Sequence, residues 1–106
     1  MPKYLIKANY TLDGLKGVRE KGAKSRADAV SNMVQGMAGV VESFYFAFGD
    51  TDVYVVAELP DDESAAAVAL TVGAAGGATT STVKLLTVEQ ADAALGLSVD
   101  YVPPGG

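Results

Sequence analysis

The segment from Val40 to Leu59 constrains the fold most, because it combines two strand-like runs with a tight turn between them. The turn contains Gly49 and Asp50, which favour the backbone of a hairpin. Successive side chains of a strand point to opposite faces of the sheet, and in both runs the two faces each carry apolar side chains. A sheet face in contact with water carries polar ones instead. The sequence therefore predicts a β-hairpin with a packed layer against each face.

Helix and strand patterns surround this hairpin. The first half of the chain is predicted to form a strand (3–9), a helical region in two pieces (12–39) and the hairpin (40–59). A helix with acidic residues in its first turn (60–77), a hydroxyl-rich strand (79–87) and a short helix (88–95) follow. Gly22 is expected to bend the first helical region, with Ser25 capping its second piece. This order favours an α+β, ferredoxin-like βαββαβ fold, with both helices on one face of a four-stranded antiparallel sheet. Residues 1–96 are assigned to this single domain and residues 97–106 to a C-terminal tail.

The residues expected on the sheet face opposite the helices indicate self-association. If Val53 and Val55 face the helices, Tyr54 between them faces outward. The neighbouring strand adds to that outer face either its three phenylalanines or the alternate set, which contains Val41 and Tyr45. A contiguous apolar patch of this size marks an interaction site. We therefore expect an obligate homodimer formed sheet to sheet, or a higher homo-oligomer.

Residue types that the chain lacks restrict its chemistry. The 106 residues include no Cys, His or Trp, which excludes disulfides, thiolate catalysis, imidazole metal sites and Ser-His-Asp triads. Catalysis would have to use Asp, Glu, Lys, Tyr or a hydroxyl group. The acidic run at residues 61–63 is interpreted as a helix start rather than a metal site. The carboxylates of Asp50 and Asp52 lack a metal-loop spacing, so we expect neither a metal nor a cofactor.

The net charge of −5 is unevenly distributed along the chain. Seven of the eight basic residues lie within residues 1–30, where there are only three acids. An acidic protein argues against nucleic-acid binding, and no apolar run is long enough for a signal sequence or a membrane helix. We therefore expect a cytoplasmic protein with no nucleic-acid or membrane partner. The basic stretch is interpreted as a solvated helix face, the alternative being attraction to an anion or to an acidic surface of a second copy.

Polar residues on the predicted open face are the candidate ligand contacts. A lysine, an amide, a phenol and a carboxylate among apolar neighbours are typical of a small-molecule pocket, and burial would shift the pKa of Glu58 upward or that of Lys7 downward. The alternative is that these two residues pair with each other or with the second subunit. The candidate binding residues, polar contacts and apolar walls together, are Lys7, Asn9, Phe46, Phe48, Asp52, Tyr54 and Glu58.

Several short motifs follow one another in the second half of the chain. They are Phe-Gly-Asp-Thr-Asp, Pro-Asp-Asp-Glu, and a Gly-Gly pair before a threonine-rich strand that ends in Lys-Leu-Leu-Thr, at residues 48–52, 60–63, 76–77 and 84–87. In this order they resemble the GYD-domain family of small bacterial proteins, and the resemblance extends from Tyr10 to about Thr87. The chain differs from the family pattern at Thr51, where tyrosine is usual, and at Gly77 and Thr79, where asparagine and arginine are expected.

The resemblance implies a ferredoxin-like fold and dimers of the dimeric α/β-barrel type, because the GYD family is related to that superfamily. Superfamily relatives include cofactor-independent monooxygenases, lactone isomerases and haem enzymes. Haem binding is disfavoured, because the chain has no histidine to serve as an iron ligand. If the chain is an enzyme, the resemblance implies a cofactor-free isomerase or monooxygenase, by analogy of fold.

Two hypotheses of function follow from these patterns. In the first, a small homo-oligomeric protein binds a small molecule in a pocket on the open sheet face. In the second, a structural or regulatory assembly protein uses its sheet face and its tail to bind other subunits or a partner protein. The tail is apolar for a terminus and contains the stiff pair Pro103-Pro104, so it either latches onto such a partner or folds back on its own domain.

Overall fold

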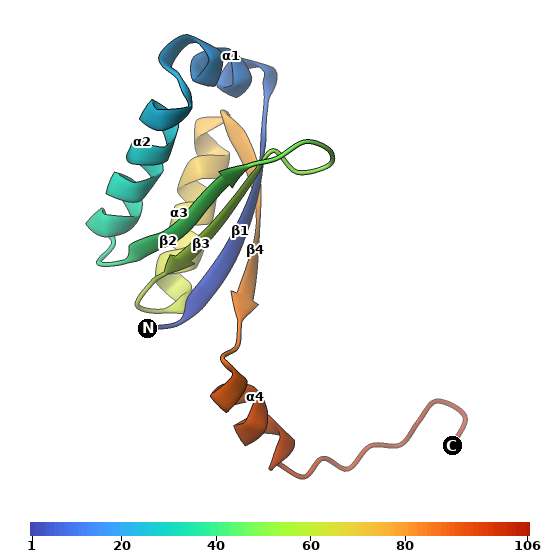
Figure 1. Cartoon of the computed structure of the whole chain (residues 1–106). Helices are drawn as coiled ribbons and strands as arrows, with labels where there is room; N and C mark the ends of the chain where they lie inside the picture. The colour runs from blue at the N-terminus through green and yellow to red at the C-terminus, as the bar shows by residue number, and fades with distance from the viewer.

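Four strands form one antiparallel sheet, and two long helices lie against one of its faces (Figure 1). The computed structural model describes all residues, 1–106. In chain order the elements are β1 Lys3–Tyr10, α1 Leu12–Lys21, α2 Ala23–Gly36, β2 Val40–Phe46, β3 Val53–Glu58, α3 Asp62–Ala75, β4 Ala78–Leu85 and α4 Val88–Leu95. The strand order is β2-β3-β1-β4, so each βαβ unit encloses a strand of the other unit. The predicted α+β, ferredoxin-like fold is confirmed.

Local signals set the ends of the helices. The Asp61 carboxylate accepts a hydrogen bond from the Ser64 N–H at 2.8 Å and caps α3, as the sequence predicts. Gly22 separates α1 from α2 with a φ of 95°, a conformation that favours glycine. The expected cap at Ser25 is absent, because α2 already begins at Ala23 and its first turn has no side-chain cap.

A β-bulge in β2 decides which of its residues face the helices. The pairing with β3 shifts register between Val41 and Ser43, so Val41 and Phe44 both lie on the helix side. Phe46 follows on the same side, while Ser43 and Tyr45 face the open side. Neither set expected from strict alternation is therefore correct as a whole, because the extra residue in the bulge reverses the parity partway along the strand.

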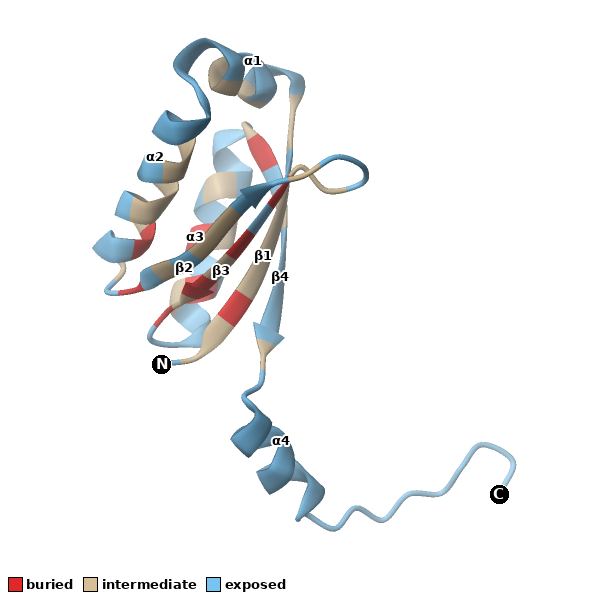
Figure 2. Ribbon diagram, in the orientation of Figure 1, coloured by how far each residue is buried: buried red, intermediate tan, exposed pale blue.

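The hydrophobic core lies between the sheet and helices α2 and α3 (Figure 2). It consists of Tyr4, Val34, Val53, Val55, Ala57, Leu59 and Ala65. The alternate residues of β3 that the sequence predicts to face the helices are the buried ones. Judged by length and hydropathy, none of the four helices could cross a membrane.

The chain beyond β4 leaves the packed body. Every residue from Leu86 to Gly106 is exposed, and both α4 and the following segment extend away from the sheet (Figures 1 and 2). α4 nevertheless has a complete capping box, in which Thr87 and Gln90 exchange side-chain and backbone hydrogen bonds of 2.8 and 3.1 Å. Its start is therefore locally encoded, although no other element covers it.

Candidate functional site

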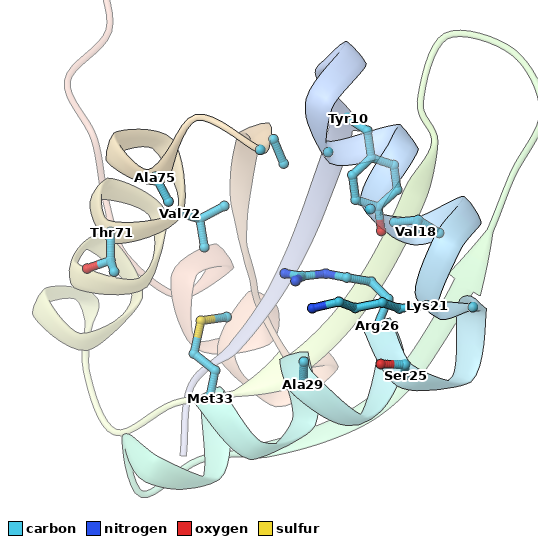
Figure 3. A pocket seen from close by; sticks show the side chains of 15 residues that line it. Tyr10, Val18, Lys21, Ser25, Arg26, Ala29, Met33, Thr71, Val72 and Ala75 are labelled. Carbon is cyan, nitrogen blue, oxygen red and sulfur yellow. The ribbon is translucent and has the colours of Figure 1, made fainter.

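A cavity of about 500 Å³ opens on the helix side of the sheet. Its walls come from the end of β1, from α1, from the first turns of α2, and from the last turns of α3 with the start of β4 (Figure 3). A smaller cavity of about 50 Å³ lies against the sheet and shares Tyr10, Arg26, Met33, Val72 and Ala78 with it. The larger space therefore continues toward the apolar core.

Two cations point into this cavity from the same side. The side chains of Lys21, at the end of α1, and Arg26, in the first turn of α2, extend across the space toward α3 (Figure 3). No Asp or Glu is among the fifteen lining residues. Neither cation takes part in any of the three ion pairs of the chain. The cavity is thus a positive site in a protein whose net charge is −5.

Polar groups of different chemistry surround the two cations. The Tyr10 hydroxyl points toward Arg26 (Figure 3), and the Ser25 side chain lies at the exposed rim. Burial raises the pKa of the Tyr10 phenol, and the neighbouring Arg26 guanidinium opposes that rise. The uncapped first turn of α2 adds the partial positive charge of a helix N-terminus. Together these groups suit an anionic group with an acceptor oxygen.

The space itself results from small side chains. Gly14 and Gly17 on α1, Ala29 on α2, and Ala75 on α3 line the cavity without filling it. Val18, Met33 and Val72 provide the larger apolar surfaces. Sequence reasoning missed this site, although the glycines of the first helix and the basic stretch around them were the available signals. Pairing those signals with α3 required the tertiary structure.

The structure places three of the predicted open-face residues, Lys7, Tyr54 and Glu58, on the opposite side of the sheet from this cavity. Lys7 and Tyr54 are directly opposite each other on β1 and β3. Glu58 lies on the same face but is paired in register with Lys3, not with Lys7. Lys3 forms an ion pair with Glu42 at 2.8 Å. The hydrogen bond to Glu42 within this ion pair, more than the charge of Glu58, raises the pKa of Lys3.

Asn9 and Asp52 have structural partners at the end of the hairpin. The Asp52 backbone N–H donates to the Asn9 side-chain oxygen, and the Tyr10 backbone N–H donates to the Asp52 carboxylate, both at 2.9 Å. These two bonds tie the loop between β2 and β3 to the end of β1. They account for both side chains without a ligand.

The two predicted aromatic walls do not join Tyr54. Phe46 lies on the helix side, where its ring contacts Phe44 edge-on with centroids 5.3 Å apart. Phe48 is fully exposed in the loop after β2. The prediction that these two residues wall a pocket on the open face therefore finds no support, because the bulge and the loop direct them elsewhere.

The open face itself is uncovered, and about half of its residues are apolar. It presents Leu5, Val40, Tyr45, Tyr54, Val56, Val83 and Leu85. The side chain of Tyr45 is 69% exposed and that of Val83 is 40% exposed, although both belong to strands. The two long helices lie on the other face (Figure 1).

Comparison with known proteins identifies a family. The family model of the GYD domain matches residues 4–95, which includes all four helices and all four strands except Lys3, the first residue of β1. No curated protein and no solved structure matches the chain.

Proposed function

The chain belongs to the GYD-domain family, and from this premise we propose that it binds a small amphipathic organic anion in the helix-side cavity. The observation that carries the proposal is a cavity with two cations and no carboxylate, next to apolar walls. Its volume of about 500 Å³ lies in the range of small-molecule sites.

The absence of a carboxylate partner inside the protein supports an external one. The chain has more acids than bases, and Lys24 on the outer side of α2 has its own partner, Asp28, at 2.9 Å. Arg26, two residues further along, is half-buried and has no such partner. Withdrawing a cation from water is unfavourable unless an anion compensates it. A bound anion would supply that compensation.

The lining of the cavity suits a ligand with an anionic end and an apolar end. Arg26 and Lys21 would hold its anionic end, and the phenol of Tyr10, whose pKa burial raises, stays protonated at neutral pH as a hydrogen-bond donor. Val72 and Met33 would contact an apolar end that reaches toward the smaller cavity. The location differs from the open-face pocket expected from the sequence, whereas the class of function is the same.

A fluorescent amphipathic anion tests this proposal. Anilinonaphthalene sulfonate should bind the native chain, and octanoate should displace it where octylamine does not. The double variant Lys21→Gln/Arg26→Gln should weaken binding about tenfold or more, because charged hydrogen bonds contribute about 1.5–3 kcal/mol each. The matched control is Lys16→Gln/Arg19→Gln, which removes the same charge from outside the cavity. Equal weakening by both variants, or displacement by octylamine, would contradict the proposal.

We also propose that the protein is a homodimer whose copies meet through their open sheet faces. The supporting observation is the uncovered apolar face, with tyrosines and valines on strands that no helix of the same chain covers. A second copy would remove this patch from water. The ligand cavity lies on the other side of the sheet, so neither proposal depends on the other.

A further inference from the structure

Helix α4 has no partner within its own chain. All of its residues are exposed, and a helix of eight residues is marginal in water without tertiary contacts. Val88 and Leu95, seven positions apart, lie on one face and are 80% and 83% exposed. Beside them are Glu89 and Asp92, and the segment from Leu86 to the C-terminus contains no basic residue. The free surface of α4 is therefore apolar and acidic.

Helix α1 presents a surface of complementary chemistry. Leu12 and Leu15 are 69% and 53% exposed on its outer side. Lys16 and Arg19 follow these leucines at helical spacing, and neither forms an ion pair in the structure. An apolar and basic face would match the apolar and acidic face of α4 in both packing and charge.

The two helices cannot meet within one chain. They lie at opposite ends of the molecule (Figure 1), because α1 adjoins the start of β4 and α4 follows its end. The eight residues of β4 span about 26 Å. The two linking residues and the whole of α4 together reach only about 19 Å. α4 folded back along its own strand would therefore not reach α1.

We propose that α4 of one copy packs against α1 of a second copy, with leucine and valine side chains at the centre and Glu89 and Asp92 facing Lys16 and Arg19. In a dimer with two-fold symmetry this contact forms twice. In a head-to-tail assembly each copy uses its α4 on one neighbour and its α1 on the other, which produces a ring or a filament. The contact involves surfaces separate from the open sheet face and from the cavity.

Site-directed crosslinking tests the contact, because the chain has no cysteine of its own. Full-length Leu15→Cys and Leu95→Cys chains are mixed under mild oxidation, and the mixed dimer is identified by its mass. The control replaces the first variant by Leu70→Cys, an exposed leucine on α3 that is 73% exposed. We expect the Leu15–Leu95 pair to crosslink about tenfold more than the control pair, because contact raises the effective concentration of the thiols. Equal crosslinking of both pairs, or of neither, would overturn the proposal.

Charge reversal separates this contact from other ways of associating. Lys16→Glu/Arg19→Glu in the Leu15→Cys chain should lower the crosslink about threefold, as two rim ion pairs become two repulsions. Adding Glu89→Lys/Asp92→Lys to the Leu95→Cys chain should restore it. An unchanged crosslink after the first reversal, or no recovery after the second, would show that these charges do not face each other and would overturn the proposed contact.

Discussion

At the scale of single residues, Tyr4 connects the core to the charged surface. Its side chain is only 2% exposed, and its hydroxyl donates to the Asp62 carboxylate at 2.6 Å. Burial, and then the hydrogen bond to Asp62, raise the pKa of Tyr4 to about 12. The same hydrogen bond, followed by that from Lys84, lowers the pKa of Asp62. One phenol thus joins β1 to the first turn of α3.

The variant Tyr4→Phe should therefore be less stable and should respond differently to alkaline pH. Loss of the hydrogen bond should cost about 1 kcal/mol at neutral pH, measured by urea unfolding. The folded pKa of about 12 is above the unfolded value of 10.0, so the native chain should lose stability as the pH rises between these values. Tyr4→Phe should lose less over that interval. Tyr101→Phe, in the exposed C-terminal segment, serves as the control.

This role of the hydroxyl would be contradicted if Tyr4→Phe were as stable as the wild type and lost stability at alkaline pH in the same way. The acid side offers a second check. Because the folded pKa of Asp62 is lowered, its contribution is present above the unfolded pKa and is lost as the pH falls through the folded value. The difference between native and Tyr4→Phe chains should accordingly narrow in acid.

At the scale of elements, the contact between α1 and the turn before β4 shapes the ligand cavity. The Thr11 backbone N–H donates to the Gly77 carbonyl at 3.1 Å, and the Thr11 hydroxyl donates to the Gly76 carbonyl at 2.8 Å. Thr11 also caps α1 through a hydrogen bond from the Gly14 N–H. A Cβ atom at Gly14 would overlap the Gly77 carbonyl, so this approach requires glycine. The first helix and the α3–β4 turn are thereby held together across one end of the cavity.

Two glycine substitutions on the same helix should have opposite effects on stability. Gly14→Ala should destabilise the fold by about 1–3 kcal/mol, because its methyl group would have to displace backbone. Gly17→Ala should stabilise it by about 0.5–1 kcal/mol, because no atom lies within 4 Å of the added carbon and alanine favours helix. Thermal and urea unfolding measure both. Equal effects of the two substitutions would show that the contact of α1 with the turn is not specific.

At the scale of the whole molecule, the chain is a packed body with an extended C-terminal segment and two uncovered surfaces. Its longest dimension is 56 Å against 34 and 24 Å for the others. The helix side contains the core and the cavity, while the open face and α4 have no intramolecular cover. In our proposals, the ligand occupies the helix side and copies of the chain occupy the remaining surfaces.

A charge on the open face should separate the proposed sheet-to-sheet dimer. Val83→Asp is placed in a chain that also carries Glu89→Lys/Asp92→Lys, so that the proposed α4 contact is weakened equally in the variant and in its control. The dissociation constant should rise about a hundredfold, since an unpaired carboxylate would be buried in the interface. Sedimentation velocity measures the change, and Leu70→Asp on the outer side of α3 is the control. Dimers that persist with Val83→Asp, or a monomeric parent chain, would contradict the proposal.

The sequence determined much of the fold because its signals are local. Alternation identified the buried face of β3, Asp61 marked the start of α3, and Gly22 marked the break between α1 and α2. Alternation did not identify the faces of β2, because the bulge at Val41–Ser43 is set by pairing with β3. The motifs that resemble the GYD-domain family also agree with the family match over residues 4–95.

The candidate site was decided only by the tertiary structure. Tyr10, Lys21, Arg26 and Val72 lie on separate elements, and no spacing along the chain indicates that they meet around one cavity. Asn9 and Asp52, which the sequence presents as free polar groups, are occupied by backbone partners. The sequence by itself determined the elements and the faces that regular alternation marks, because those depend on neighbouring residues. Packing decided the cavity, since its shape depends on how far small side chains let α1, α2 and α3 approach one another.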